Sequence, residues 1–176
     1  MTTLLYQGHG SYRITANDGT VIYVDPFAGT GYDVPGDLVL VTHEHFDHTQ
    51  VQLVHLNQKG KVWREKDFLQ QGQYATKRFE DIVVTATPAQ NAHHPIDQCV
   101  GYLIGLDGLT LYCAGDTSTT DYMASDLAGR PIDYALLPID GVFNMGPAEA
   151  SDCARTIGAV HTIPVHTAPV NGPEDS

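Results

Sequence analysis

The sequence is poor in basic residues, and this scarcity argues against several classes of function. Only 9 Lys and Arg stand against 21 Asp and Glu, which leaves a formal charge of −12 over 176 residues. Nucleic-acid-binding proteins draw most of their affinity from basic side chains that meet phosphates, and basic clusters also attract proteins to anionic lipid surfaces. We therefore expect neither a nucleic-acid partner nor a membrane partner.

Long apolar runs and cysteines are also scarce. No stretch approaches the roughly 18 consecutive apolar residues of a membrane span, and Met1–Gly8 has neither the basic nor the apolar region of a signal peptide. The 3 cysteines, Cys99, Cys113 and Cys153, are odd in number and widely spaced, which is typical of reduced thiols. These features favour a cytoplasmic protein.

The remaining composition is that of a folded domain. Hydrophobic residues make up 42% and charged residues 17% of the chain, which argues against disorder. A chain of this length can bury roughly 70% of its unfolded surface. Since no repeat or long linker divides the sequence, we expect one domain over residues 1–176.

Short apolar runs alternate with turn signals along the chain. Strands are expected over 4–7, 11–15, 21–24, 37–42, 61–64, 74–79, 82–87, 100–105, 110–114, 134–137 and 162–165. Helices are expected over 47–60, 66–71, 122–127 and 147–158. The last of these has Pro147 in its first turn and Gly158 as its C-cap. Two strand-rich blocks, each followed by helices, predict an α/β protein with two packed mixed sheets and helices outside, an αββα sandwich.

The most informative segment is 43–48, which has the sequence His-Glu-His-Phe-Asp-His and follows an apolar strand. Residues two apart in an extended chain point to the same side, so His43 and His45 can reach one metal ion. Asp47 and His48 follow where the chain changes direction, and they can face a second ion. A single histidine is more often an ordinary surface residue, and Asp47 alone would serve as a helix N-cap. The combined pattern favours a metal site.

This segment resembles the signature of the metallo-β-lactamase-fold hydrolase superfamily, and the likeness extends from about Leu4 to His166. Segment 114–117 (Ala-Gly-Asp-Thr) is similar to the family's Gly-Asp-Thr segment, 163–166 (Ile-Pro-Val-His) to the strand with the last histidine ligand, and 91–95 (Asn-Ala-His-His-Pro) to the third-histidine segment. Segments 8–10, 24–27, 137–141 and 145–150 resemble a small bacterial branch that includes ascorbate-phosphate lactonase.

The resemblance implies a site with two metal ions. One ion would be held by His43, His45 and His94, and the other by Asp47, His48 and His166, with the catalytic carboxylate of Asp116 between them. Imidazoles with two carboxylates suit zinc best, and also manganese or iron. A bridging water would ionise near neutral pH and attack as hydroxide, while the ions polarise the substrate oxygen. Asp47 is therefore expected to be catalytic as well.

Three further residues have both a functional and an ordinary interpretation. Asp25 would accept a hydrogen bond from a metal-binding imidazole, or it would only form a turn with the proline that follows. His9 would line the cleft as a proton donor or substrate contact, or lie in a surface loop. For the pair His93 and His94, we expect His94 to bind metal because the proline after it restricts its backbone to an extended conformation. His93 would point away or line the cleft.

The leading hypothesis is an enzyme, a dinuclear metal-dependent hydrolase of a small ester, lactone or phosphodiester. A nuclease of the same superfamily would carry the same motif, but no basic patch is visible. A redox di-iron member would typically have a carboxylate at the position of His45, and a non-catalytic member would have lost several ligands. Asn144 and Tyr12 are weaker candidates for substrate contact, and homo-oligomerisation stays open.

The segment after His166 departs from the family pattern. Related hydrolases usually continue with another strand and a helix, whereas 10 residues follow His166 here. We expect either a minimal version of the fold or a second sheet with a trimmed outer edge.

Overall fold

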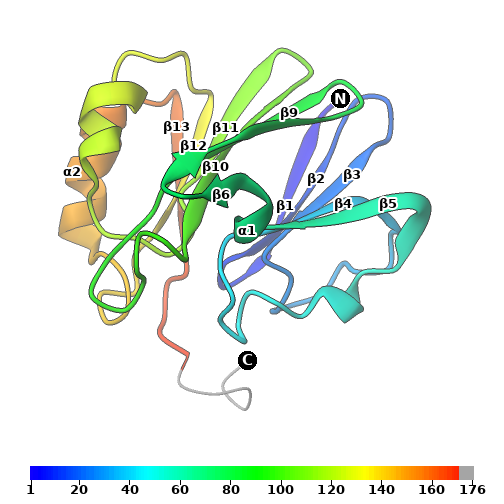
Figure 1. Ribbon diagram of the computed structural model, residues 1–176, viewed down its shortest axis with the longest axis horizontal. Coiled ribbons are helices and arrows are strands. Elements are labelled where there is room, and N and C mark those ends of the chain that lie inside the picture. Colours follow the sequence, from blue (N-terminus) through cyan, green and yellow to red (C-terminus); the bar gives the residue numbers. More distant parts are fainter. Residues whose placement is uncertain (171–176) are drawn as a thin grey trace. The chain divides into compact units, whose positions relative to one another are not determined.

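The computed structural model describes residues 1–170, which form two compact units. Unit 1 comprises Met1–Arg64 together with Val170, and unit 2 comprises Glu65–Pro169. Each unit contains one large mixed sheet (Figure 1). The expected domain of 1–176 extends into residues 171–176, which lie outside the described residues, and the single-domain hypothesis stays a prediction.

The sheet of unit 1 has the order β1-β2-β3-β4-β5. Its strands are β1 (Thr3–Gly8), β2 (Ser11–Thr15), β3 (Val21–Val24), β4 (Gly36–Val41) and β5 (Leu56–Arg64). β1, β2 and β3 pair antiparallel, whereas β3, β4 and β5 pair parallel. Residues 38–41 of β4 are fully buried, as expected for an apolar strand covered on both faces.

The prediction of a helix over 47–60 is wrong. This segment contains only the 3₁₀ turn η1 (Val51–Leu53), and β5 begins at Leu56. The apolar residues that are spaced as on a helix instead anchor a connecting turn: Val54 packs in the core of unit 1, in the same cluster as Tyr23. The chain from Leu56 onward pairs with β4, so its backbone groups are used by the sheet.

Unit 2 has a six-stranded sheet with the order β13-β12-β11-β10-β9-β8. The strands are β8 (Thr76–Phe79), β9 (Ile82–Pro88), β10 (Val100–Leu106), β11 (Leu109–Cys113), β12 (Tyr134–Pro138) and β13 (His161–Val165). Pairing is antiparallel from β8 to β11 and parallel from β11 to β13. The short elements α1 (Glu65–Phe68), β6 (Leu69–Gln70) and β7 (Gln73–Tyr74) precede this sheet. The helix expected over 66–71 therefore ends early, and the strand expected over 74–79 is divided between β7 and β8.

One face of the second sheet is covered by α2 (Pro147–Ile157) and η2 (Met123–Leu127), a short π-helical segment (Figure 1). α2 begins with Pro147, and Gly158 is its C-cap. Gly158 has a left-handed φ of 68°, which glycine adopts without strain because it has no Cβ. The prediction for this helix is confirmed. Among residues 1–170, no helix is both long and apolar enough to cross a membrane.

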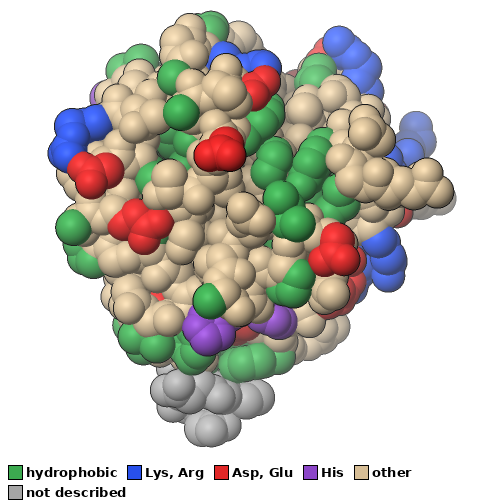
Figure 2. Space-filling model, turned by 60° about the vertical axis from the view of Figure 1, so that its left-hand side comes forward, with side chains coloured by type: hydrophobic (Ala, Val, Ile, Leu, Met, Phe, Trp, Pro, Cys, Tyr) green, Lys and Arg blue, Asp and Glu red, His purple; other side chains and the backbone are tan. Residues whose placement is uncertain are grey.

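The surface shows how the acidic composition is distributed. On the face drawn in Figure 2, acidic side chains lie singly among neutral and apolar ones, and basic side chains stand beside several of them. On this face the acidic side chains are therefore dispersed.

Candidate metal centre

In unit 1, the expected site residues follow strands that run in the same direction. β2 is antiparallel to both β1 and β3, and β4 is parallel to β3, so β1, β3 and β4 end at the same edge of the sheet. His9 follows β1, Asp25 follows β3, and His43 follows β4. The topology alone thus brings these three segments together.

The Asp25 carboxylate orients His48 directly and His43 through the Thr42 hydroxyl. Its Oδ2 lies 2.9 Å from His48 Nδ1 and accepts a 2.6 Å hydrogen bond from the Thr42 hydroxyl. The same hydroxyl lies 3.0 Å from His43 Nδ1. Because the hydroxyl gives its one hydrogen to Asp25, His43 donates from Nδ1. With Nδ1 as the donor, each ring presents a lone pair at Nε2, the form that binds a metal ion.

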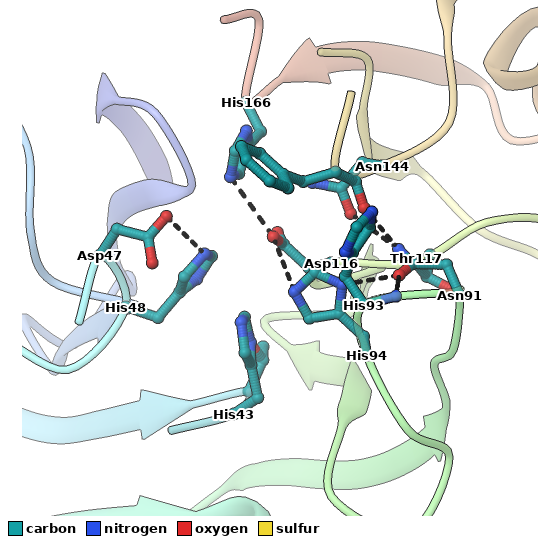
Figure 3. A network of polar contacts seen from close by, with 12 residues as sticks. His43, Asp47, His48, Asn91, His93, His94, Asp116, Thr117, Asn144 and His166 are labelled. Carbon is teal, nitrogen blue, oxygen red and sulfur yellow. Dashed lines mark hydrogen bonds and ion pairs between the residues drawn. The ribbon is translucent and has the colours of Figure 1, made fainter. Parts of the chain in front are cut away.

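The other expected ligands of unit 1 lie beside these two rings. The ring centroid of His43 is 4.2 Å from that of His48 and 4.6 Å from that of His45. Asp47 Oδ2 lies 2.9 Å from His9 Nε2 and 3.8 Å from His48 Nε2 (Figure 3). His43 and His48 are buried, whereas His45 is exposed. Asp47 therefore contacts His9 and does not cap a helix.

In unit 2, the expected residues also follow strands of one direction. β10 is antiparallel to β9 and β11, and β11, β12 and β13 are parallel, so β9, β11, β12 and β13 share a direction. Four side chains follow these strands in turn: His94, Asp116, Asp140 and His166. They consequently lie along one edge of the second sheet.

Asp116 joins the two buried histidines of this edge. Its Oδ2 lies 3.4 Å from His94 Nε2 and 3.3 Å from His166 Nε2 (Figure 3). All three side chains are at most 4% exposed. Two imidazole nitrogens and one carboxylate oxygen are thus gathered out of water within unit 2.

Asn91 fixes the orientation of His94. Asn91 Nδ2 donates to the Phe143 carbonyl at 2.9 Å, so its Oδ1 is the atom that lies 2.8 Å from His94 Nδ1. His94 must then donate from Nδ1 and present Nε2 as a lone pair. The adjacent His93 is exposed, and its ring lies edge-on to Phe143 with the ring centroids 5.4 Å apart.

Asp140 holds the ring of His166. Its Oδ2 lies 3.1 Å from His166 Nδ1, while its Oδ1 accepts hydrogen bonds of 2.7 Å from the backbone amides of Val142 and Phe143. Burial acts to raise the pKa of Asp140, but these amides, the Asn144 side chain and the nearby His166 outweigh it, and the pKa is lowered. Asp140 therefore remains a carboxylate.

Backbone strain falls on several of these positions. His9, Asp25 and His166 have φ values of 51°, 45° and 46°, in the left-handed region that non-glycine residues rarely adopt. Such conformations persist where the surrounding structure enforces them, commonly at functional sites.

The structure adds partners that the sequence did not indicate. Thr42, Asn91 and Asp140 each place an oxygen near the Nδ1 of a buried histidine. Asp140 carried a usable signal, since it follows an apolar strand as Asp116 does. Imidazole nitrogens combined with carboxylate oxygens fit zinc, manganese or iron better than calcium, which prefers oxygen ligands alone.

Comparisons with known proteins agree on one family. Residues 3–166 match the model of the β-lactamase superfamily domain. The chain is 30% identical to a UPF0173 metal-dependent hydrolase of Thermococcus kodakarensis, covering 94% of this chain and 84% of that protein. It is 33% identical to a UPF0173 metal-dependent hydrolase of Methanoculleus marisnigri, covering 93% and 80%.

A solved structure from Parabacteroides distasonis, described by name as a metal-dependent hydrolase, gives the same result. It superposes with a TM-score of 0.80 at 25% identity, over 97% of this chain and 84% of that one. The expected fold class is confirmed, whereas the likeness to ascorbate-phosphate lactonase stays a prediction. The chain belongs to the β-lactamase superfamily and is a metal-dependent hydrolase with the metallo-β-lactamase fold.

Proposed function

We propose that this hydrolase uses two divalent metal ions, with zinc as the preferred metal, to cleave a small ester, lactone or phosphodiester. Three residues would hold one ion, namely His43, His45 and His94. Three others would hold the second ion, namely Asp47, His48 and His166, and Asp116 would be shared. The donor sets found within each unit support this assignment.

The observation that carries the proposal is the common arrangement of four buried histidines. His43, His48, His94 and His166 each have an oxygen of Thr42, Asp25, Asn91 or Asp140 within 3.1 Å of Nδ1. Metal-binding histidines in proteins nearly always have such a partner on the other ring nitrogen, because it fixes the ring and the tautomer. In unit 2, the rings of His94 and His166 also face the same Asp116 oxygen. Two imidazole nitrogens and a carboxylate oxygen gathered in a buried place favour the binding of a cation.

The residues and the ions would divide the chemistry between them. Bound divalent ions would supply a water that ionises near neutral pH and would polarise the substrate oxygen. Asp47 and Asp116 would offset the charge of the ions. His9, whose Nε2 lies 2.9 Å from Asp47 Oδ2, is placed to exchange a proton at that oxygen.

The charge of the protein favours a small substrate over a polymer of phosphates. A formal charge of −12 repels an extended polyanion, whereas two metal ions can still attract a single phosphate or carboxylate. The exposed ring of His93, supported by Phe143, would provide a contact for such a substrate.

Activity assays test the reaction class. Metal-loaded protein should hydrolyse at least one lactone or small phosphodiester, lose this activity on chelation and recover it when zinc is added. Efficient cleavage of RNA without turnover of any small molecule would instead support a nuclease.

Metal titration tests the assignment of the adjacent histidines. His94→Ala should weaken zinc binding by at least tenfold, while His93→Ala, one position away, should bind zinc with about the affinity of the wild type. Equal losses in the two variants, or a larger loss for His93→Ala, would contradict the assignment.

A further inference from the structure

The polar contacts of unit 2 form a closed circuit around Asp116. Asp116 contacts both His94 and His166 through their Nε2 atoms. The Nδ1 atoms of the same two rings contact Asn91 and Asp140. One further side chain, Asn144, connects these last two residues and completes the circuit; Figure 3 labels Asn144 and Asn91 beside His94 and His166.

Asn144 has the two chemical ends that this connection requires. Its Nδ2 donates a 2.7 Å hydrogen bond to Asp140 Oδ2, and its Oδ1 accepts a 3.3 Å hydrogen bond from Asn91 Nδ2. Because a carboxylate can only accept, the amide orientation is fixed. The residue is 8% exposed, so water competes little for these bonds.

We propose that Asn144 is a positioning residue that couples His94 and His166, holding both imidazoles in one arrangement toward the Asp116 carboxylate. This inference rests on the proposed function in that the two rings are taken as metal ligands. Asn91 and Asp140 each orient one ring, whereas Asn144 acts on both. Its loss should therefore disturb the two rings together.

The loop that contains Asn144 has other restraints. Asp140 Oδ1 accepts hydrogen bonds from the backbone amides of Val142, Phe143 and Asn144, and the Met145 amide donates to the Thr117 carbonyl. These bonds do not use the Asn144 side chain. A change of that side chain alone is consequently expected to leave the loop in place while the circuit is broken.

Asn144→Asp gives the sharpest test, because it keeps the shape but replaces the donor facing Asp140 with a second carboxylate oxygen. Asn57→Asp is a matched control, since Asn57 Nδ2 also donates a 2.7 Å hydrogen bond to a carboxylate, that of Asp37, in unit 1. Asn144→Ala is the second variant, because it removes both bonds without adding charge and serves if Asn144→Asp does not fold.

Two measurements decide the proposal. Zinc affinity, measured by competition with a chromophoric chelator, should fall about tenfold or more in Asn144→Asp and Asn144→Ala, the usual range for a lost partner of a metal ligand. Nitrogen NMR of ¹⁵N-histidine-labelled, metal-free protein should show shifts for both His94 and His166, assigned with single alanine variants. Asn57→Asp should change neither readout.

The outcomes separate this inference from the proposed function. If wild-type protein binds no zinc, the proposed function fails, and the histidine spectra still test whether Asn144 positions the rings. Zinc affinity within about twofold of wild type, or spectra in which only one ring or neither responds to Asn144→Asp and Asn144→Ala, would overturn the role of Asn144.

Discussion

A glycine sets the space available to His48 in unit 1. A Cβ built at Gly10 would lie 2.9 Å from Cε1 of the His48 ring, closer than real contacts allow. His48 Nδ1, which would lie 3.4 Å from this Cβ, is held by Asp25 at 2.9 Å, so the ring can yield only by loosening that bond. Gly10 is thus required by close packing on a candidate ligand.

Gly10→Ala should therefore displace His48. We expect a loss of about 1–3 kcal/mol in the free energy of unfolding, the usual cost of overpacking, together with weaker zinc binding. Urea unfolding and chelator competition measure the two effects. Gly105→Ala is the control, because its Cβ would have its nearest neighbour, Val83, at 3.9 Å; similar losses in both variants would contradict the account.

At this scale the sequence identifies ligand candidates better than their partners. The motif at 43–48 and the likeness at 91–95, 114–117 and 163–166 single out residues that the fold places at strand ends. Asn91 is only three residues from His94, but their contact depends on the conformation of the loop between them. Asp140 and His166 are separated in the sequence by the whole of α2, so no spacing rule connects either pair. Their roles depend on backbone conformations, such as the φ of 46° at His166, which cannot be predicted from the residue type.

At the scale of elements, prediction succeeded where local signals and tertiary packing agree. Pro147 and Gly158 mark both ends of α2, and the apolar run of β4 marks a buried strand. The prediction failed over 47–60, where apolar residues with helical spacing lie in a turn between two parallel strands and pack against the core of unit 1. The pairing of β5 with β4 is long-range and outweighs the local preference.

β11 contains a buried phenol that makes stability depend on pH. Burial raises the pKa of Tyr112 well above the ordinary value of 10.0. The folded protein therefore keeps this proton at a pH where the unfolded chain loses it, so the stabilisation is present below about pH 10 and is lost as the pH rises further.

Tyr112→Phe should flatten this dependence. Between about pH 10 and 11, urea unfolding of metal-free protein should show the wild-type free energy of unfolding falling more steeply, by up to about 1.4 kcal/mol per pH unit, because Phe releases no proton. Tyr6→Phe, at a position 39% exposed, should retain the wild-type slope. Identical slopes for wild type and Tyr112→Phe would contradict the argument.

For the whole molecule, an excess of acidic residues is combined with buried groups in each unit that suit a cation. The formal charge of −12 and the dispersed acidic side chains of Figure 2 disfavour a polyanionic partner. The buried imidazoles and carboxylates of both units nevertheless make metal ions a source of local positive charge. This contrast supports the proposal that this metal-dependent hydrolase acts on a small substrate.

The metal content of the purified protein tests the central claim most directly. Elemental analysis by plasma mass spectrometry of wild-type protein, loaded with zinc and freed of excess metal, should give about two ions per chain, as expected for two sets of three ligands with a shared carboxylate. Asp116→Ala should bind markedly less metal. A wild-type protein that hydrolyses its substrate while containing no metal would contradict the account.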